Sequence, residues 1–352
     1  MKKSRAKWKR RSLLALSAAL LLALGLGETE RALTVPAAAC LSLCGGETPK
    51  MLVPVGRAVG IKLFSEGVMV VGLAESAAGG PSPAQLAGLE EGDRILAING
   101  EEVESTEHVQ SLLRQSDGSV MTLSVFREDR ELELSLAPES GDGGARMGAW
   151  IRDSMAGIGT VTYVDPATGR FAALGHSIND VDTGLLMPLA DGAVMAASIT
   201  KVRRGSAGEP GELKGSFDLT ADLGILYDNN ECGVFGVLEK NELTTGEALP
   251  VASPLQVRPG KATILADVSG SGTEEYEIEI SRLYPLSGST RNMLITVTDQ
   301  RLLSLTGGIV QGMSGSPIIQ DGKLVGAVTH VLLKDPTRGY GIFIENMLDA
   351  AG

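Results

Sequence analysis

Histidine, cysteine and aromatic residues are scarce in this chain of 352 residues. There are three histidines and three cysteines, and aromatic residues make up only 4%. An odd number of cysteines without a Cys-x-x-Cys pair supports neither a disulfide framework nor a zinc ribbon. The chain also lacks a His-Glu-x-x-His motif, which excludes a zincin site. Any reaction that needs an imidazole must therefore use His108, His176 or His330.

Basic residues are scarce beyond the N-terminus. Seven of the 31 Lys and Arg residues lie in the first eleven positions, so the rest of the chain carries 24 bases against 43 acids. Nucleic-acid binding depends on clustered Lys and Arg, so this acidic body excludes nucleic acid as the expected partner. The 45 glycines, together with so few aromatics, favour a β-rich fold with many turns.

Long apolar runs are also missing, except near the start. The apolar and small residues Leu13–Gly27 follow the basic cluster and form a run of 15 residues. This is typical of a signal-peptide core and is short for a membrane-spanning helix, which needs about 20 residues. The basic flank predicts that the start stays cytoplasmic and that the rest is exported. We expect residues 1–30 to be a signal peptide or a retained anchor, and residues 31–52 to be a linker.

Residues 53–138 show the pattern of a small domain with strands and one or two helices. Met121–Phe126 and Glu131–Leu136 alternate as strands, and Glu107–Arg114 has helical spacing. The dipeptide Asn99-Gly100 predicts a tight hairpin turn. His108 falls on the helical stretch, where we do not expect a catalyst.

The stretch from Ala84 to Gly100 carries Ala-Gly-Leu, Gly-Asp and Ile-Asn-Gly in succession, and it resembles a PDZ domain. PDZ domains add an extended peptide to a sheet edge and often hold its terminal carboxylate with loop amides. By this resemblance, the peptide-binding loop would consist of Gly60, Ile61, Lys62 and Leu63. Lys62 is either a carboxylate partner or a solvated surface lysine.

Residues 144–352 are expected to form a second domain after a glycine-rich linker. Its decisive feature is Gly312-Met-Ser314-Gly-Ser-Pro317, followed by a predicted hairpin with its turn at Asp321-Gly322. Glycines permit an unusual backbone there, and the amides of Gly312 and Ser314 could then form an oxyanion hole. The motif resembles the nucleophile turn of chymotrypsin-like proteases. We therefore expect a mainly β fold with a chymotrypsin-like double β-barrel.

A serine nucleophile needs a base, and His176 precedes Ser314 in the order found in chymotrypsin-like enzymes. The rival is His330, which ends the strand expected to line the substrate pocket and so favours a role in specificity or packing. Spacing alone leaves the third group of a triad open among several carboxylates: Asp180, Asp182, Asp218, Asp222, Asp228 and Asp299.

Three longer segments extend the resemblance to the whole chain. They are Ile151–Thr160, Ala173–His176, and Thr298 through Val331, with Asp335–Gly341 closing the match. Here the chain resembles the SpoIVB peptidase family of endospore-forming bacteria. The resemblance implies that Ser314, His176 and Asp299 form the catalytic triad. Gln300 departs from the proline common at that position in the family.

The resemblance also implies a role. It predicts a serine endopeptidase, exported across the forespore inner membrane into the intermembrane space as an anchored or secreted protein. There it would cleave the extracytoplasmic part of a membrane-bound regulatory complex, which triggers intramembrane activation of a late mother-cell sigma factor. The expected partners are protein or peptide substrates and a second copy bound through the PDZ domain. No metal or organic cofactor is required.

Two alternatives remain. One is a non-enzymatic PDZ scaffold with an inactive protease fold, against which the intact serine motif and His176 argue. The other is a quality-control protease of the HtrA type. Those enzymes place the PDZ domain after the protease, whereas this chain places it before.

Overall fold

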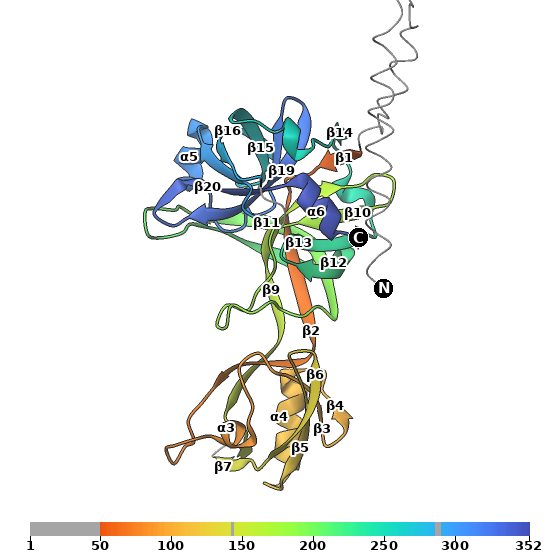
Figure 1. Cartoon of the computed structure of the whole chain (residues 1–352), viewed down its shortest axis with the longest axis vertical. Helices are drawn as coiled ribbons and strands as arrows, with labels where there is room; N and C mark the ends of the chain where they lie inside the picture. The colour runs from red at the N-terminus through yellow and green to blue at the C-terminus, as the bar shows by residue number, and fades with distance from the viewer. Residues whose placement is uncertain (1–49, 142–143, 286–289) are drawn as a thin grey trace, which may run out of the picture. The chain divides into compact units, whose positions relative to one another are not determined.

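The computed structural model describes residues 50–141, 144–285 and 290–352, and strands dominate them (Figure 1). The expected signal or anchor segment, most of the linker at 31–52, Cys40 and Cys44 lie outside these residues. Within the described part of the chain, no helix combines the length and apolarity needed to cross a membrane.

Six strands close into a first ring. Its order is β2 (Ala58–Leu73), β9 (Ala149–Val164), β10 (Arg170–Ala173), β13 (Gly233–Leu238), β12 (Glu212–Asn230) and β11 (Asp191–Arg203), and β11 pairs again with β2. Short strands β1 (Met51–Pro54) and β14 (Leu249–Pro250) extend the sheet beside β9. Apolar side chains such as Val59, Phe171 and Val194 fill the interior of the ring.

A second closed barrel follows in the chain. It consists of β15 (Gly260–Ala266), β16 (Glu274–Leu283), β17 (Met293–Val297), β20 (Asp335–Phe343), β19 (Lys323–Leu332) and β18 (Pro317–Gln320). Strand β16 shows why this sequence forms a barrel wall: Tyr276, Ile278 and Ile280 alternate inward with outward-facing glutamates. Helices α5 (Gln300–Thr306) and α6 (Ile344–Ala350) and two 3₁₀ turns, Asn241–Leu243 and Pro254–Gln256, complete this part of the chain.

The PDZ elements lie between β2 and β9 in the chain. They are α3 (Pro83–Ala87), β3 (Arg94–Ile98), β4 (Glu101–Glu102), α4 (Thr106–Gln115), β5 (Met121–Arg127) and β6 (Arg130–Leu136), followed by the hairpin of β7 (Glu139–Gly141) and β8 (Gly144–Arg146). The predicted turn at Asn99-Gly100 is confirmed, because both residues have positive φ between β3 and β4. Their own apolar cluster includes Ile95, Val109 and Leu123.

The structure corrects the predicted peptide-binding loop. Gly60, Ile61, Lys62 and Leu63 lie in the middle of β2, paired on one side with β9 and on the other with β11. A strand with two paired edges has no row of amides left for a peptide carboxylate. Lys62 instead places its ammonium over the ring of Phe64, at 4.3 Å. The prediction of a PDZ loop at these four residues is therefore wrong.

Strands β2 and β9 also change the predicted domain organisation. They pair from Ala58↔Thr160 to Leu73↔Ala149, with shifts of register after Phe64 and Val70, so one end of each belongs to the first ring and the other end lies beside the PDZ strands. Of the residues assigned from sequence to the PDZ domain, 58–64 belong to strand β2 of the ring, and 53 and 54 belong to β1 beside it. Of the glycine-rich linker expected at 140–146, the described residues lie in strands β7 and β8, at 140–141 and 144–146.

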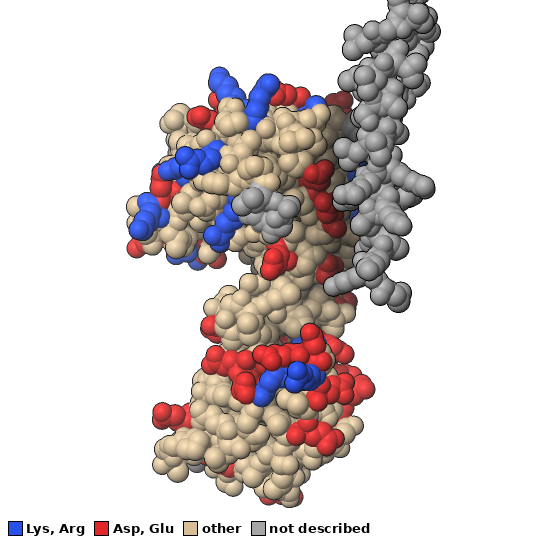
Figure 2. Space-filling model, viewed as in Figure 1, with Lys and Arg blue, Asp and Glu red and all other residues tan. Residues whose placement is uncertain are grey.

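The acidic charge expected from composition is unevenly distributed. On the face shown in Figure 2, Asp and Glu side chains gather over the PDZ elements, while Lys and Arg are more frequent over the second barrel. The acidic gathering offers nucleic acid no continuous basic surface on this face.

Candidate active site

The loop that carries Ser314 depends on glycine. Gly312 and Gly315 both have positive φ, at 99° and 96°. A Cβ atom at Gly315 would lie 2.1 Å from the carbonyl oxygen of Thr160, so no larger residue fits. Thr160 on β9 also donates its amide to the carbonyl of Ser314. The first ring therefore holds the backbone of the nucleophile loop directly.

His176 enters the same site through a second strained turn. It follows β10 after Leu174 and Gly175, both with φ of 69°. Its Nδ1 lies 2.8 Å from the carbonyl oxygen of Ser177. A carbonyl only accepts, so Nδ1 carries the proton and Nε2 keeps its lone pair. Burial lowers the pKa of His176 below its ordinary value of 6.5. The ring is therefore unprotonated at neutral pH and can accept a proton.

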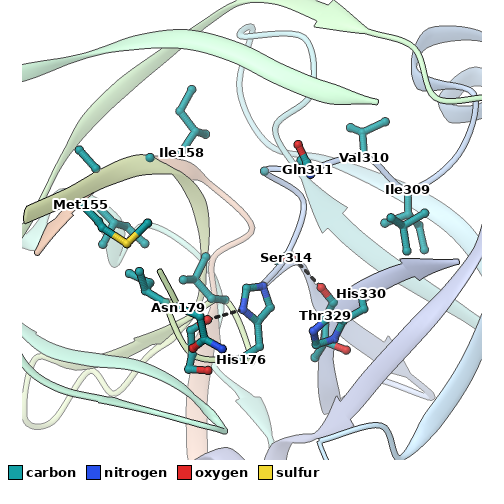
Figure 3. A pocket seen from close by; sticks show the side chains of 18 of the residues that line it. Met155, Ile158, His176, Asn179, Ile309, Val310, Gln311, Ser314, Thr329 and His330 are labelled. Atoms are coloured by element: carbon teal, nitrogen blue, oxygen red, sulfur yellow. Dashed lines mark hydrogen bonds between the residues drawn. The ribbon is translucent and has the colours of Figure 1, made fainter. Parts of the chain in front are cut away.

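Ser314 and His176 line one cleft of about 550 Å³ between the two barrels (Figure 3). The remaining walls are largely apolar and come from β2, β9, the loop before Ser314, and β19. They include Ile61, Met155, Ile158, Ile309, Val310 and Val331. A groove with apolar walls and a few convergent polar groups is typical of a site that binds an extended organic ligand.

The hydroxyl of Ser314 is directed to the backbone in this structure. It donates to the carbonyl oxygen of Thr329 at 2.6 Å (Figure 3). A hydroxyl has one proton, so it cannot donate to His176 at the same time. The structure thus brings the predicted nucleophile and base into one cleft, and rotation of the Ser314 side chain must precede proton transfer.

The predicted oxyanion hole has free donors. Within residues 50–352 as described, the amides of Gly312 and Ser314 donate to no protein acceptor, whereas the amide of Met313 is bound to Val310. The hydroxyl of Thr160 donates to the carbonyl of Gly312 at 2.7 Å and holds that peptide in place. Two free amides, one of the serine itself and one two residues before it, can stabilise the charge of a tetrahedral intermediate.

Asp299 does not lie in the site. It is the N-cap of α5, and its carboxylate accepts hydrogen bonds from the amides of Arg301, Leu302 and Glu277. The guanidinium of Arg301 lies 2.8 Å from the same group, and this pairing is the main cause that lowers the pKa of Asp299 to about 2. Asp299 lines neither cavity that contains His176. The structure therefore does not bring together the three residues of the expected triad.

A different aspartate organises the chain next to His176. Asp180 is 1% exposed and accepts bonds from the amides of Asp182 and Thr183 and from the Thr183 hydroxyl. It also forms an ion pair with Arg152 on β9. The sequence left Asp180 among the carboxylates that could serve the triad, but these contacts show that it shapes the loop after His176.

His330, considered from sequence as a rival base or as a residue of specificity or packing, lies against His176. The ring centroids are 4.9 Å apart and the planes are tilted by 39°. Its Nδ1 is buried and has no hydrogen-bond partner among the residues that the structure describes. The pKa of His330 is lowered to about 4, mainly by burial and to a lesser extent by the charges of His176 and Arg291. The sequence signal for His330 was its position on the second strand of the hairpin that follows Ser314.

No three His, Cys, Asp or Glu side chains among the described residues are grouped to hold a metal ion. Cys232 is a partly buried thiol with no disulfide partner in the described part of the chain, and burial raises its pKa. The polar groups of the cleft are the hydroxyls of Ser177, Ser314 and Thr329, two imidazoles, backbone amides and the side chains of Asn179 and Gln311.

Comparison with known proteins shows similarities to two family models, to one further protein and to solved structures. Residues 75–127 match a PDZ domain. A segment of 96 residues is 34% identical to LL2128 of Lactococcus lactis subsp. lactis, which is named provisionally as a zinc metalloprotease; the match covers 27% of this chain and 21% of that protein.

Among solved structures, the active form of the Rv3671c protease from M. tuberculosis aligns with a TM-score of 0.32 and 15% identity, over 56% of this chain and 73% of that one. The HtrA-type protease AlgW with a tripeptide gives a TM-score of 0.33 and 15% identity, over 55% and 54%.

Residues 143–348, more than half of the chain, match the family model described as SpoIVB peptidase S55. The match includes both His176 and Ser314, and it continues through strand β19. A serine peptidase is the activity that this family and the contents of the cleft have in common. The chain belongs to the SpoIVB peptidase S55 family.

Proposed function

We propose that this serine peptidase is an endopeptidase of sporulation signalling, in which Ser314 is the nucleophile and His176 the general base. The observation that carries the proposal is the cleft itself. It holds a neutral His176 with Nε2 available, a serine on a glycine-held loop, and two unengaged amides. These are the groups that acyl transfer on a peptide bond requires.

The proposed mechanism starts when substrate enters the cleft and Ser314 turns away from Thr329. Nε2 of His176 takes the hydroxyl proton as Oγ attacks the scissile carbonyl, and the amides of Gly312 and Ser314 stabilise the oxyanion. His176 then gives the proton to the leaving amine, and water hydrolyses the ester by the same sequence of steps. The carbonyl of Ser177 supports the Nδ1–H tautomer, which is the tautomer this mechanism needs.

The walls of the cleft support a substrate class. Aliphatic side chains from both barrels surround the serine, so we propose that the cleaved segment is extended and presents apolar side chains beside the scissile bond. A segment just outside a membrane, within a membrane-bound regulatory complex, fits this preference. Export into the intermembrane space, cleavage of such a regulator, and self-association through the PDZ domain are parts of the same proposal.

Labelling of the full-length protein with a fluorophosphonate probe tests the chemistry. We expect the wild type to be labelled and to cleave an extracytoplasmic peptide library at a few sites with apolar neighbours. Ser314→Ala should do neither while keeping its circular dichroism spectrum and melting temperature. The non-enzymatic scaffold would be favoured if the wild type, shown to be folded, gave no labelling. The HtrA-type alternative would be favoured if the wild type degraded unfolded casein at many sites.

A further inference from the structure

The cleft contains one titratable group that the proposed mechanism does not use. His330 comes from β19, immediately after Thr329, whose carbonyl accepts the Ser314 hydroxyl. Its ring lies against that of His176 with centroids 4.9 Å apart, and it lines both cavities that include His176. The three side chains Ser314, His176 and His330 thus meet in one place, as Figure 3 shows.

Among the described residues, no carboxylate forms a hydrogen bond or ion pair with the His176 ring, although Glu231 lines the second cavity with it. Only burial and the Ser177 carbonyl shift the pKa of His176, and the aspartate expected to serve it is bound to Arg301 on α5. A carboxylate in that place would orient the imidazole and stabilise the imidazolium. The Ser177 carbonyl can orient the imidazole, because it fixes the ring tautomer. As a neutral group it does little to stabilise the imidazolium.

We infer that His330 is a positioning residue for His176: its neutral ring fixes the plane of the general base and gives the imidazolium a polar neighbour during acyl transfer. This inference rests on the proposed function. The unpartnered Nδ1 of His330 supports it, because a buried ring nitrogen without a partner is unfavourable by about 1–3 kcal/mol and is expected where another state of the site satisfies it.

The charge state of His330 is consistent with this role. Burial and the neighbouring charges keep its pKa near 4, so it is uncharged when His176 becomes a cation at neutral pH. A second cation in contact with the first would oppose proton transfer instead. The charged groups around the two rings are Glu231 and Arg291, which line the smaller cavity together with Asn179 and Thr290.

Three substitutions separate positioning from packing. His330→Ala removes the ring, His330→Phe keeps a ring without nitrogens, and His330→Asn places a polar atom near the position of Nδ1. We expect kcat and the fluorophosphonate labelling rate to fall by about ten- to a hundredfold in the Ala and Phe variants, with KM within about twofold. His330→Asn should recover a substantial part of the rate.

His108→Ala is the matched control, because His108 is on α4, where it pairs with Glu101 at 3.2 Å. It should be labelled at the wild-type rate. Melting temperatures show whether each variant is folded; if the Ala variant is unfolded, the comparison of Phe with Asn still decides.

Three outcomes would overturn the inference. Wild-type rates in the folded Phe variant would show that the nitrogens have no role. A raised KM with unchanged kcat would show that His330 contacts the substrate instead. Equal rates for Asn and Phe would reduce His330 to packing. If the wild type itself is not labelled, the proposed function fails first, so the two failures are distinguishable.

Discussion

Thr160 on β9 holds the peptide of Gly312 through a hydrogen bond of 2.7 Å from its hydroxyl to the Gly312 carbonyl. This bond joins the first ring to the loop of the second barrel that carries Ser314. Because the Gly312 carbonyl is held on one side, the amides on either side of Met313 keep their direction. Thr160 therefore acts on the proposed oxyanion hole without touching the substrate.

Thr160→Val should lower kcat by about tenfold or more, because the Gly312 peptide loses its anchor and an oxyanion-hole donor is worth about 10²–10³ in rate. Steady-state cleavage of a short peptide measures this. Thr162→Val is a close control: Thr162 is 0% exposed on the same strand, but its hydroxyl has no hydrogen-bond partner within residues 50–141, 144–285 and 290–352. That variant should keep its rate and be at least as stable as the wild type. Equal losses in both variants would contradict the assigned role of Thr160.

Substitution of Asp299 should act on stability. Asp299→Ala removes the N-cap of α5 and the partner of Arg301, so we expect a loss of about 1–2 kcal/mol in the free energy of unfolding. Asp299→Asn keeps a good capping group and should lose less. Denaturant unfolding measures both, and fluorophosphonate labelling of the folded variants should persist. A lost label at unchanged stability would show that Asp299 serves His176 directly.

The same residue predicts a pH dependence of stability. The pKa of Asp299 is about 2 in the folded state, below the ordinary value near 3.9. Its contribution is therefore complete above the unfolded-state pKa and is lost as the pH falls from there toward 2. Thermal melts between pH 5 and pH 2 should show a smaller drop for Asp299→Asn than for the wild type. Parallel curves would contradict this attribution.

The pH dependence of activity should reflect His176. Because burial lowers its pKa, the acidic limb of kcat/KM should fall below the ordinary value of 6.5, and the enzyme should remain active in mildly acidic buffer. The base must be neutral, so the rate decreases as the pH falls through that limb. A limb at or above 6.5 in a protein that is stable at that pH would contradict this expectation.

Glycine at position 315 is a packing requirement. Gly315→Ala would place a Cβ 2.1 Å from the Thr160 carbonyl at a φ of 96°, so we expect a misfolded loop with no labelling. Gly322→Ala is the control, because Gly322 also has positive φ but open space around its Cβ position. That variant should stay active and lose only about 1 kcal/mol. Full labelling of folded Gly315→Ala would contradict the loop geometry.

Local patterns predicted the elements near the site well. The Asp321-Gly322 turn between β18 and β19 is where the sequence placed it, and the predicted helix over Glu107–Arg114 lies within α4. These features depend on turn chemistry and side-chain period, which neighbouring residues determine. The pairing of His176 with Ser314 was expected from their order in the sequence and from the family resemblance.

The errors concern partners that are distant in the sequence. The apolar stretch 58–64 reads as a strand, but its period does not say which sheet it joins, and the structure pairs it with β9 and β11. For Asp299, the local signal was present: an aspartate before Gln-Arg-Leu-Leu is typical of a helix N-cap, and family resemblance outweighed it. His330 meets His176 only because two barrels face each other.

The pairing of β2 with β9 from Ala58↔Thr160 to Leu73↔Ala149 makes the PDZ segment an insertion into the peptidase rather than a module in front of it. A truncated chain that began at residue 144 would lack β2, one of the six strands of the first ring. The edges of β9 and β11 that pair with β2 would then be exposed and could pair with a strand of another molecule. A cut after the PDZ elements therefore cannot release an intact peptidase. A ligand bound to the PDZ elements would act on β2 and β9, the same two strands that line part of the substrate cleft.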